Sequence, residues 1–312
     1  MKIVYMGTPD FAVYALESII EAGYDVAAVF TQPDKAKGRS KALIPTPVKE
    51  CALKNNIPVY QPEKIREQEY IDILKNINPD CIVVAAYGQI LPESILNIPN
   101  YGCINIHASL LPKYRGAAPI ERAIIDGEKV TGVTTMYMEK GLDTGDIIEK
   151  TEVIIADDDT GETLTAKLAD AGAKLIISTL KSLADKTAIR IKQDDSCSTY
   201  AAMLNKEMGN IDFSKSASEI ERQIRGLIPW PCAYTRIDGK SVKIYKAQVK
   251  NIDSAEEHKP GEIIEVTKKS FTINCGKDAI IIKNLQPEGK KQMDAASYLN
   301  GNKITVGMMV GE

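Results

Sequence analysis

Residues 81–86 read CIVVAA, an unbroken apolar run directly after the polar stretch NINPD at 76–80. An apolar run without polar alternation is typical of a strand buried on both faces, as in a parallel sheet. Other strand candidates of this half are the segments 2–6, 25–31, 58–60 and 102–107. Segments with helical apolar spacing stand among them, at 11–22, 48–55 and 67–76. This alternation predicts an α/β fold with a doubly wound, mostly parallel sheet.

The pattern changes in the second half of the chain. Residues 130–138 and 146–155 are two further strand candidates, residues 160–184 predict one long helix, and a polar, mixed stretch follows. A helix at 216–226 then precedes short strand candidates at 233–237, 242–248, 261–266, 271–275 and 279–285. Five short strands at this spacing predict a small β-barrel of the oligonucleotide/oligosaccharide-binding type. We therefore predict an α/β domain at 1–189, a linker at 190–205 and an OB-like domain at 206–312.

Composition and charge narrow the class of protein. A chain of 312 residues with 44% hydrophobic and 26% charged residues suits a two-domain soluble protein. The net charge is −3, while residues 206–312 carry 17 Lys and Arg against 14 Asp and Glu. The acidic total argues against a general nucleic-acid binder but leaves room for a local basic patch. No segment resembles a signal peptide or a membrane span, so we expect a cytoplasmic protein without a membrane partner.

Two kinds of site are disfavoured by the motifs that are missing. The six cysteines form no C-x-x-C pair and only two histidines are present, so no metal site is predicted. The first strand is followed by Gly7-Thr8-Pro9-Asp10, which lacks the second and third glycines of a dinucleotide-binding turn. A nicotinamide-dependent dehydrogenase, the alternative from fold class alone, is therefore disfavoured.

A polar pair stands at the end of the strand candidate 102–107. Asn105 and His107 are two residues apart, so on a strand their side chains point to the same side. They lie at the carboxyl end of the strand, where open α/β sheets place their ligands. A lone histidine is more often structural, but this neighbouring amide and the strand-end position favour a functional site.

A second polar motif is the loop GLDTGD at 141–146, between two strand candidates. Its carboxylates could serve the turn itself. Asp143 could also reach the sheet end that carries His107, although the spacing alone does not place it there.

Several longer motifs extend these observations. They are MGTPDFA at 6–12, AYGQILP at 86–92, NIHASLLPKYRGAAPI at 105–120, GLDTGD at 141–146, IPWP at 228–231 and LNG at 299–301. Together and in this order they resemble the formyltransferase family that uses 10-formyltetrahydrofolate, over nearly the whole chain. The resemblance implies that Asn105, His107 and Asp143 are catalytic. It also implies folate contacts by Ser109, Leu110, Leu111, Pro112, Tyr87 and Gly88.

The basic stretch TQPDKAKGRSKALIPTPVK at 31–49 is long for a connection and contains three prolines, so we expect neither helix nor strand there. Most such charge runs are solvated surface loops. In family members that act on tRNA, the similar loop enters the acceptor arm. The resemblance therefore implies that Lys35, Lys37, Arg39 and Lys41 contact initiator methionyl-tRNA, whose α-amine would receive the formyl group.

Two alternatives remain at this point. Formyltransferases acting on glycinamide ribonucleotide or on amino sugars share the Asn, His and Asp, and they differ in the acceptor. A non-catalytic RNA-binding protein, with the small barrel as the working part, is the more distant alternative and leaves the three residues without a role. The sequence does not determine the oligomeric state, and we expect a monomer.

Overall fold

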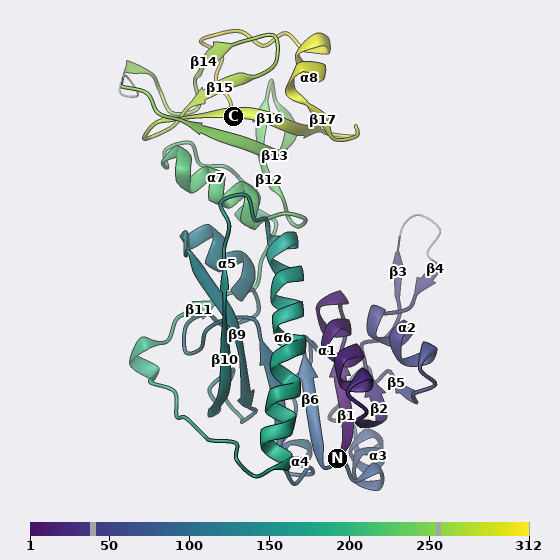
Figure 1. Ribbon diagram of the computed structural model, residues 1–312. Helices are drawn as coiled ribbons and strands as arrows, with labels where there is room; N and C mark the ends of the chain where they lie inside the picture. The colour runs from purple at the N-terminus through teal and green to yellow at the C-terminus, as the bar shows by residue number, and fades with distance from the viewer. Residues whose placement is uncertain (38–41, 254–256, 312) are drawn as a thin grey trace. The chain divides into compact units, whose positions relative to one another are not determined.

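The computed structural model describes residues 1–37, 42–253 and 257–311, and the chain falls into two compact units (Figure 1). The first unit comprises Met1–Pro119, Val130–Ile154 and Thr165–Ala201. The second unit comprises Ile120–Lys129, Ile155–Leu164 and Ala202–Glu312. The predicted division into residues 1–189, a linker and residues 206–312 stays a prediction.

A seven-stranded sheet forms the centre of the first unit, in the order β10-β9-β7-β6-β1-β2-β5. Its strands are β1 (Lys2–Gly7), β2 (Asp25–Phe30), β5 (Val59–Tyr60), β6 (Cys81–Ala85), β7 (Cys103–His107), β9 (Val130–Tyr137) and β10 (Ile147–Ile154). The strands from β5 to β7 are parallel, and β9 and β10 are antiparallel to their neighbours. The chain runs outward from β1 to β5, returns to β6 beside β1, and continues to β7. The doubly wound, mostly parallel sheet is therefore confirmed.

Helices cover both faces of this sheet. They are α1 (Asp10–Glu21), α2 (Pro47–Lys54), α3 (Gln68–Ile77), α4 (Glu93–Leu96) and α6 (Gly161–Ala184). On one face, Ile71 and Leu74 of α3 and Ile95 of α4 share a buried cluster with strand residues such as Val84. On the other face, α1 is fixed to β1 by the Tyr5 hydroxyl, which donates a hydrogen bond to the Ala12 carbonyl at 2.5 Å.

Helix α6 packs closely against the strand that carries Asn105 and His107. A Cβ atom at Gly172 would lie 3.0 Å from Cγ2 of Ile106, closer than side chains normally approach. Because Ile106 alternates with Asn105 and His107 along β7, the apolar residue is directed at α6 and the polar pair at the opposite face. The tight apolar contact therefore helps to set which way the polar pair points.

An antiparallel sheet forms most of the second unit, in the order β12-β13-β16-β15-β14. Its strands are β12 (Ala233–Ile237), β13 (Lys240–Lys250), β14 (Ile263–Val266), β15 (Phe271–Asn274) and β16 (Ala279–Pro287), with β17 (Met293–Asp294) paired to β16. The C-terminal segment joins the two edge strands, because Val310 bridges Ile237 and the Ile263 amide donates to the Met308 carbonyl at 2.9 Å. The predicted small barrel is thus closed by residues that the strand pattern did not identify.

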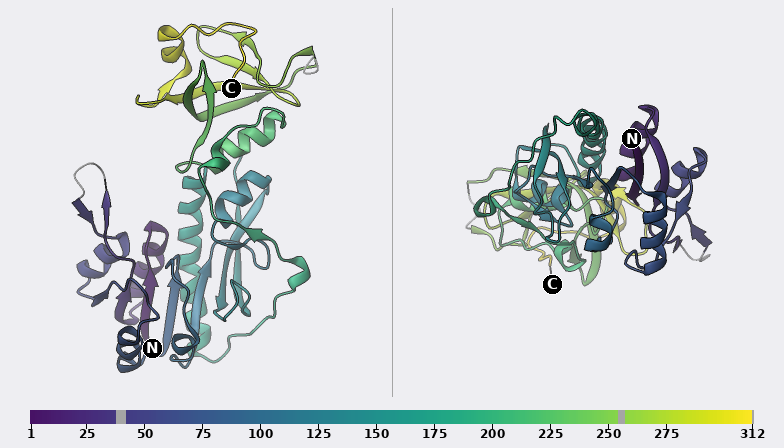
Figure 2. Two further views of the ribbon diagram at one scale, coloured as in Figure 1. Left: turned by 180° about the vertical axis from the view of Figure 1, so that it is seen from behind. Right: turned by 90° about the horizontal axis from the view of Figure 1, so that it is seen from below.

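The helices of the second unit are α7 (Ala217–Gly226), α8 (Ala295–Gly301) and most of α5 (Pro119–Asp126). A short 3-10 helix occurs at Asp195–Cys197 in the first unit and another at Glu207–Gly209 in the second. Helix α7 packs on β13 and β16 (Figure 2). Its residues Ala217, Ile220 and Ile224 lie in the unit's core. No helix within the described part of the chain is both long and apolar enough to cross a bilayer.

The prediction that residues 31–49 contain neither helix nor strand is wrong. β3 (Lys35–Lys37) and β4 (Ala42–Ile44) pair as antiparallel strands, with Lys35 opposite Ile44. The prolines flank this hairpin instead of interrupting it. Thr46 caps α2 by accepting a hydrogen bond from the Lys49 amide, and Pro47 occupies the first helical position, where a missing N–H is harmless.

Part of the segment predicted as a linker is bonded to the first unit. Ile191 forms an isolated antiparallel bridge with Ile147, the first residue of β10. β11 (Tyr200–Ala201) pairs in parallel with β8 (Arg115–Gly116). Residues 191–201 therefore contribute backbone pairing at both of their ends.

Candidate active site

Asn105 and His107 lie on β7 at the carboxyl end of the sheet, as their spacing predicted. β7 is parallel to β6 and antiparallel to β9, where Asn105 stands opposite Met136 and His107 opposite Thr134. His107 is buried and Asn105 half-buried. The two side chains therefore start from adjacent positions on one side of one strand.

The structure brings Asp143 to this pair. Asp143 Oδ1 lies 3.5 Å from Asn105 Nδ2, and Asp143 Oδ2 lies 3.7 Å from His107 Nδ1. The firmest bond of the carboxylate comes from the backbone, since the Gly116 amide donates to Oδ2 at 2.8 Å. With a side chain only 11% exposed, this carboxylate depends on nearby donors for its stability.

The other ring nitrogen of His107 is committed to the protein. Nε2 lies 2.9 Å from the Tyr114 carbonyl oxygen, which can only accept, so Nε2 carries the proton of this bond. The contacts of Asp143 with His107 Nδ1 and Asn105 Nδ2 are longer than firm hydrogen bonds. We call Asn105, His107 and Asp143 the trio. Within it, Asn105 Nδ2 and His107 Nδ1 are therefore the groups that can turn to a substrate oxygen.

The loop after β7 carries the four residues predicted to contact folate, from Ser109 to Pro112. Ser109 and Leu111 are buried, whereas Leu110 and Pro112 are half-buried. The Thr134 hydroxyl, fully buried on β9, donates to the Ser109 carbonyl at 2.6 Å and accepts from the Leu111 amide at 3.2 Å. The Lys150 ammonium donates to the Leu111 carbonyl, and partial burial lowers the pKa of this lysine.

Tyr87 and Gly88, the other two predicted folate contacts, follow β6. The Tyr87 side chain is 2% exposed and packs in the core with α3 and α4, so it offers no ring surface to a ligand. Its carbonyl accepts from the Thr8 hydroxyl at 3.0 Å and from Gln32 Nε2 at 3.1 Å. Gly88 is exposed and has a φ of +85°, which favours glycine. A folate contact at this turn would therefore be made by backbone.

The predicted tRNA contacts are only partly described. Lys35 is exposed on β3, Lys37 ends that strand, and Arg39 and Lys41 lie outside the described residues. Lys49, in the same basic stretch, is bound to Asp34 at 2.6 Å, and this bond holds the pKa of the Asp34 carboxyl below its usual range. The positive charge of Lys49 is thus balanced by the Asp34 carboxylate.

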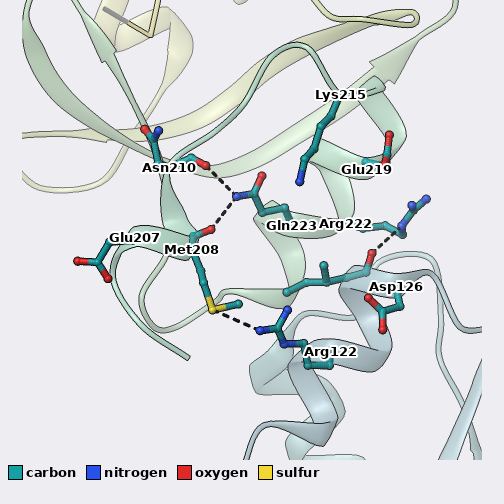
Figure 3. Close-up of a pocket in the computed structure, with 10 residues that line it drawn as sticks. Arg122, Asp126, Glu207, Met208, Asn210, Lys215, Glu219, Arg222 and Gln223 are labelled. Atoms are coloured by element: carbon teal, nitrogen blue, oxygen red, sulfur yellow. Dashed lines mark hydrogen bonds between the residues drawn. The ribbon is translucent and has the colours of Figure 1, made fainter. Parts of the chain in front are cut away.

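A cavity of about 600 Å3 occurs in the second unit, on α5, α7 and the segment before α7 (Figure 3). Its charged lining residues balance, with the cations Arg122, Lys215 and Arg222 and the acids Asp126, Glu207 and Glu219. None of the predicted catalytic or folate residues lines it. Among the described residues no cluster of His, Cys, Asp and Glu could hold a metal ion.

Comparison with known proteins identifies the family of this chain. A family model described as formyl transferase matches residues 1–180, and one described as formyl transferase, C-terminal domain, matches residues 203–303. This chain belongs to the formyltransferase family. It is 54% identical to a methionyl-tRNA formyltransferase of Lachnospira eligens, and the match covers 100% of both chains. A methionyl-tRNA formyltransferase of Alkaliphilus metalliredigens is 53% identical over 100% of this formyltransferase and 99% of the relative.

Solved structures share the fold at lower identity. The sugar 3N-formyl transferase WlaRD, crystallised in the presence of dTDP and 5-N-formyl-THF, matches 93% of this formyltransferase and 99% of its own chain. Its TM-score is 0.67 and its identity 23%. HypX from Aquifex aeolicus matches 98% of this chain and 49% of its own, with a TM-score of 0.66 and 15% identity. These likenesses concern the fold alone.

Sequence reasoning missed the residues that hold the site together. Tyr114 and Gly116 bind His107 and Asp143 through backbone atoms, which no side-chain pattern reveals. Thr134 and Lys150 are polar residues within strand candidates and read as ordinary surface or strand positions. Gln193 donates to the carbonyls of Asp143 and Gly145 from a polar, mixed stretch that carries no motif.

We expect Thr134→Val to loosen the loop at residues 109–113, because it removes one acceptor and one donor from buried backbone groups. Each buried group left unpaired costs about 1–3 kcal/mol. Hydrogen exchange followed by mass spectrometry should show faster exchange in this loop. Thr134→Ser keeps the hydroxyl and is the matched control, and equal loop exchange in the two variants would contradict the assignment.

Proposed function

We propose that this formyltransferase moves the formyl group of 10-formyltetrahydrofolate onto the α-amine of methionine carried by initiator tRNA, the step that prepares this tRNA for translation initiation. The observation that carries the proposal is the contact of one carboxylate, Asp143, with both Asn105 and His107 at the sheet end. The acceptor is supported by relatives named methionyl-tRNA formyltransferase at about half identity over the full chain. We place the reaction in the cytoplasm and expect a monomer.

The substrate amine would supply the nucleophile. Its lone pair attacks the formyl carbon, and the carbonyl oxygen becomes an oxyanion in a tetrahedral intermediate. Collapse breaks the bond to N10 of the folate, N10 takes up a proton, and the amine loses one. The products are a formamide and tetrahydrofolate. No protein nucleophile is needed, and burial raises the pKa of the Cys103 thiol on β7 to about 12, so it stays protonated at neutral pH.

Asn105 Nδ2 would donate a hydrogen bond to the oxyanion. His107 Nδ1 would donate a second one with the ring in its cationic form, because Nε2 already carries the proton that is donated to the Tyr114 carbonyl. The Tyr114 carbonyl holds the opposite ring nitrogen, so His107 presents Nδ1 in a defined direction. Donors fixed before the reaction need no reorganisation as charge develops, which is the main advantage of such a site. Asp143 would orient both donors and accept the amine proton directly or through water.

The folate would lie against the 109–112 loop and the turn at Gly88. The exposed glycine with a left-handed backbone allows close approach to its peptide groups, and Leu110 and Pro112 offer apolar surface for a flat ring system. The bonds from Thr134 and Lys150 would keep this loop in place.

The acceptor assay tests the proposal as a whole. We expect formyl transfer from 10-formyltetrahydrofolate to methionyl-tRNA, and no transfer above background to glycinamide ribonucleotide or to a nucleotide-linked amino sugar. Methionyl-tRNA with a blocked amine is the negative control. Transfer to a small amine alone would establish the related small-amine formyltransferase instead, and tRNA binding without transfer would support the non-catalytic alternative.

The catalytic roles are tested by His107→Ala and Asp143→Asn. Loss of a preorganised oxyanion donor typically lowers kcat by about 10²–10³, so we expect a loss of this size for His107→Ala in single-turnover formylation. Loss of a positioned proton acceptor typically costs about 10²–10⁴, which is the loss expected for Asp143→Asn. His258→Ala is the matched control, because His258 is the other histidine of the chain and lies in the second unit. Near-normal turnover of a folded His107→Ala enzyme would refute the role of His107.

The RNA contact is tested by replacing Lys35, Lys37, Arg39 and Lys41 with glutamine. Each lost phosphate contact should reduce the slope of log K against log salt by roughly 0.7–0.9. The control replaces Lys54, Lys64, Lys75 and Lys181, exposed lysines of the same unit, and changes the net charge equally. Equal slopes for the two quadruple variants would show that the basic stretch makes no specific contact.

A further inference from the structure

Residues 191–201, here called the 191–201 segment, run along both loops that complete the candidate site. At one end Ile191 pairs with Ile147, just beyond the Asp143 loop. At the other end Tyr200–Ala201 pairs with Arg115–Gly116. All of these residues belong to the first unit.

The first loop supplies the backbone groups that bind the trio. Tyr114 offers its carbonyl to His107, and Gly116 offers its amide to Asp143. Both residues have positive φ angles, 60° and 116°, which are unfavourable for tyrosine and require glycine at the second position. A backbone in this conformation keeps its shape only where its surroundings hold it.

Thr199 provides that support. The Tyr114 amide donates to the Thr199 hydroxyl at 2.8 Å, and the Arg115 amide donates to the Thr199 carbonyl at 2.9 Å. The Ala117 amide donates to the Ala201 carbonyl, also at 2.9 Å. The amides of Arg115 and Ala117 are therefore bound to the 191–201 segment. The Gly116 amide between them donates to Asp143 instead.

Gln193 supports the second loop and ties it to the first. Its Nε2 donates to the carbonyls of Asp143 and Gly145, each at 2.8 Å. Its Oε1 accepts from Nε and Nη2 of Arg115, at 3.1 and 2.8 Å. The Gln193 side-chain amide thus donates to the Asp143 loop through Nε2 and accepts from Arg115, in the loop that contains Tyr114, through Oε1. Asp143 itself has a φ of 52°, another conformation that needs support.

We infer that Gln193 and Thr199 are positioning residues for formyl transfer. This inference rests on the proposed function. Gln193 fixes the backbone from which the Asp143 carboxylate projects, and Thr199 fixes the carbonyl and amide that hold His107 and Asp143. The Gln193 side chain bonds to the backbone of Asp143 and the Thr199 side chain to the backbone of Tyr114, so both act on the loops that hold the three side chains. Their effect is to keep the carboxylate and the ring at the separation that leaves Asn105 Nδ2 and His107 Nδ1 available to the substrate.

The test compares variants that remove these bonds selectively. Gln193→Met keeps the length of the side chain and removes its hydrogen bonds with Asp143, Gly145 and Arg115. Gln193→Glu keeps an acceptor for Arg115 and removes both donors to the Asp143 loop. Asp195→Asn is the control, because the 81% exposed Asp195 side chain binds Arg115 at 2.7 Å without bonding to either loop's backbone.

With 10-formyltetrahydrofolate and methionyl-tRNA, we expect both Gln193 variants to lower kcat by at least about ten-fold, the size expected for a small misplacement of catalytic groups. The KM of each substrate and the melting temperature should stay near the wild-type values, and Asp195→Asn should keep wild-type kcat. Wild-type kcat in Gln193→Glu, or a raised KM at unchanged kcat, would overturn the inference.

Two Thr199 variants provide an independent test if Gln193→Met does not fold. Thr199→Val should lower kcat, and Thr199→Ser, which keeps the hydroxyl acceptor, should restore it. Equal kcat in the two variants would overturn the role of Thr199. If the wild-type enzyme itself transfers no formyl group, the proposed function fails, whereas an active wild type with fully active Gln193 and Thr199 variants defeats only the positioning role.

Discussion

The bond from the Gly116 amide to the Asp143 carboxylate joins two loops that are remote in sequence and holds the candidate site together. A carboxylate that is mostly removed from water is stable only where donors face it. The Gly116 amide supplies the short hydrogen bond, and Asn105 and His107 add longer contacts to the same carboxylate. If this bond were lost, the carboxylate would turn to solvent and both polar side chains of β7 would lose their common partner.

The sheet makes this arrangement possible because its strands differ in direction where the site is built. β7 ends at the carboxyl edge of the parallel strands, and antiparallel β9 returns beside it. Thr134 on β9 therefore reaches the loop that leaves β7, and the turn after β9 carries Asp143. Rigid strands supply the donors and loops supply their partners. The loops are restrained in turn by the buried Thr134 and by the 191–201 segment, so the polar groups are oriented before any substrate arrives.

The sequence predicted those parts that depend on local pattern. The run at 81–86 predicts a central strand, and a period of two places Asn105 and His107 on one side. Asp143 required the family resemblance, because its left-handed backbone and its bond to a remote amide leave no periodic signal. Gln193 and Thr199 were missed for the same reason. The hairpin at β3 and β4 was missed because a separate two-stranded ribbon needs no apolar alternation, so its charged residues resemble a loop.

The trio and the acceptor are separate problems. Attack on a formyl carbon develops an oxyanion and releases an amine proton whatever amine is used, and the fold is shared with a sugar formyltransferase at a TM-score of 0.67. Neither the sheet nor the chemistry can therefore select tRNA. Selection must come from surface that a small acceptor never contacts, and a polyanion is recognised over many phosphates at some distance from its reactive end. The basic stretch at 31–49 and the mildly basic residues 206–312 are the parts of this acidic protein that can supply such surface.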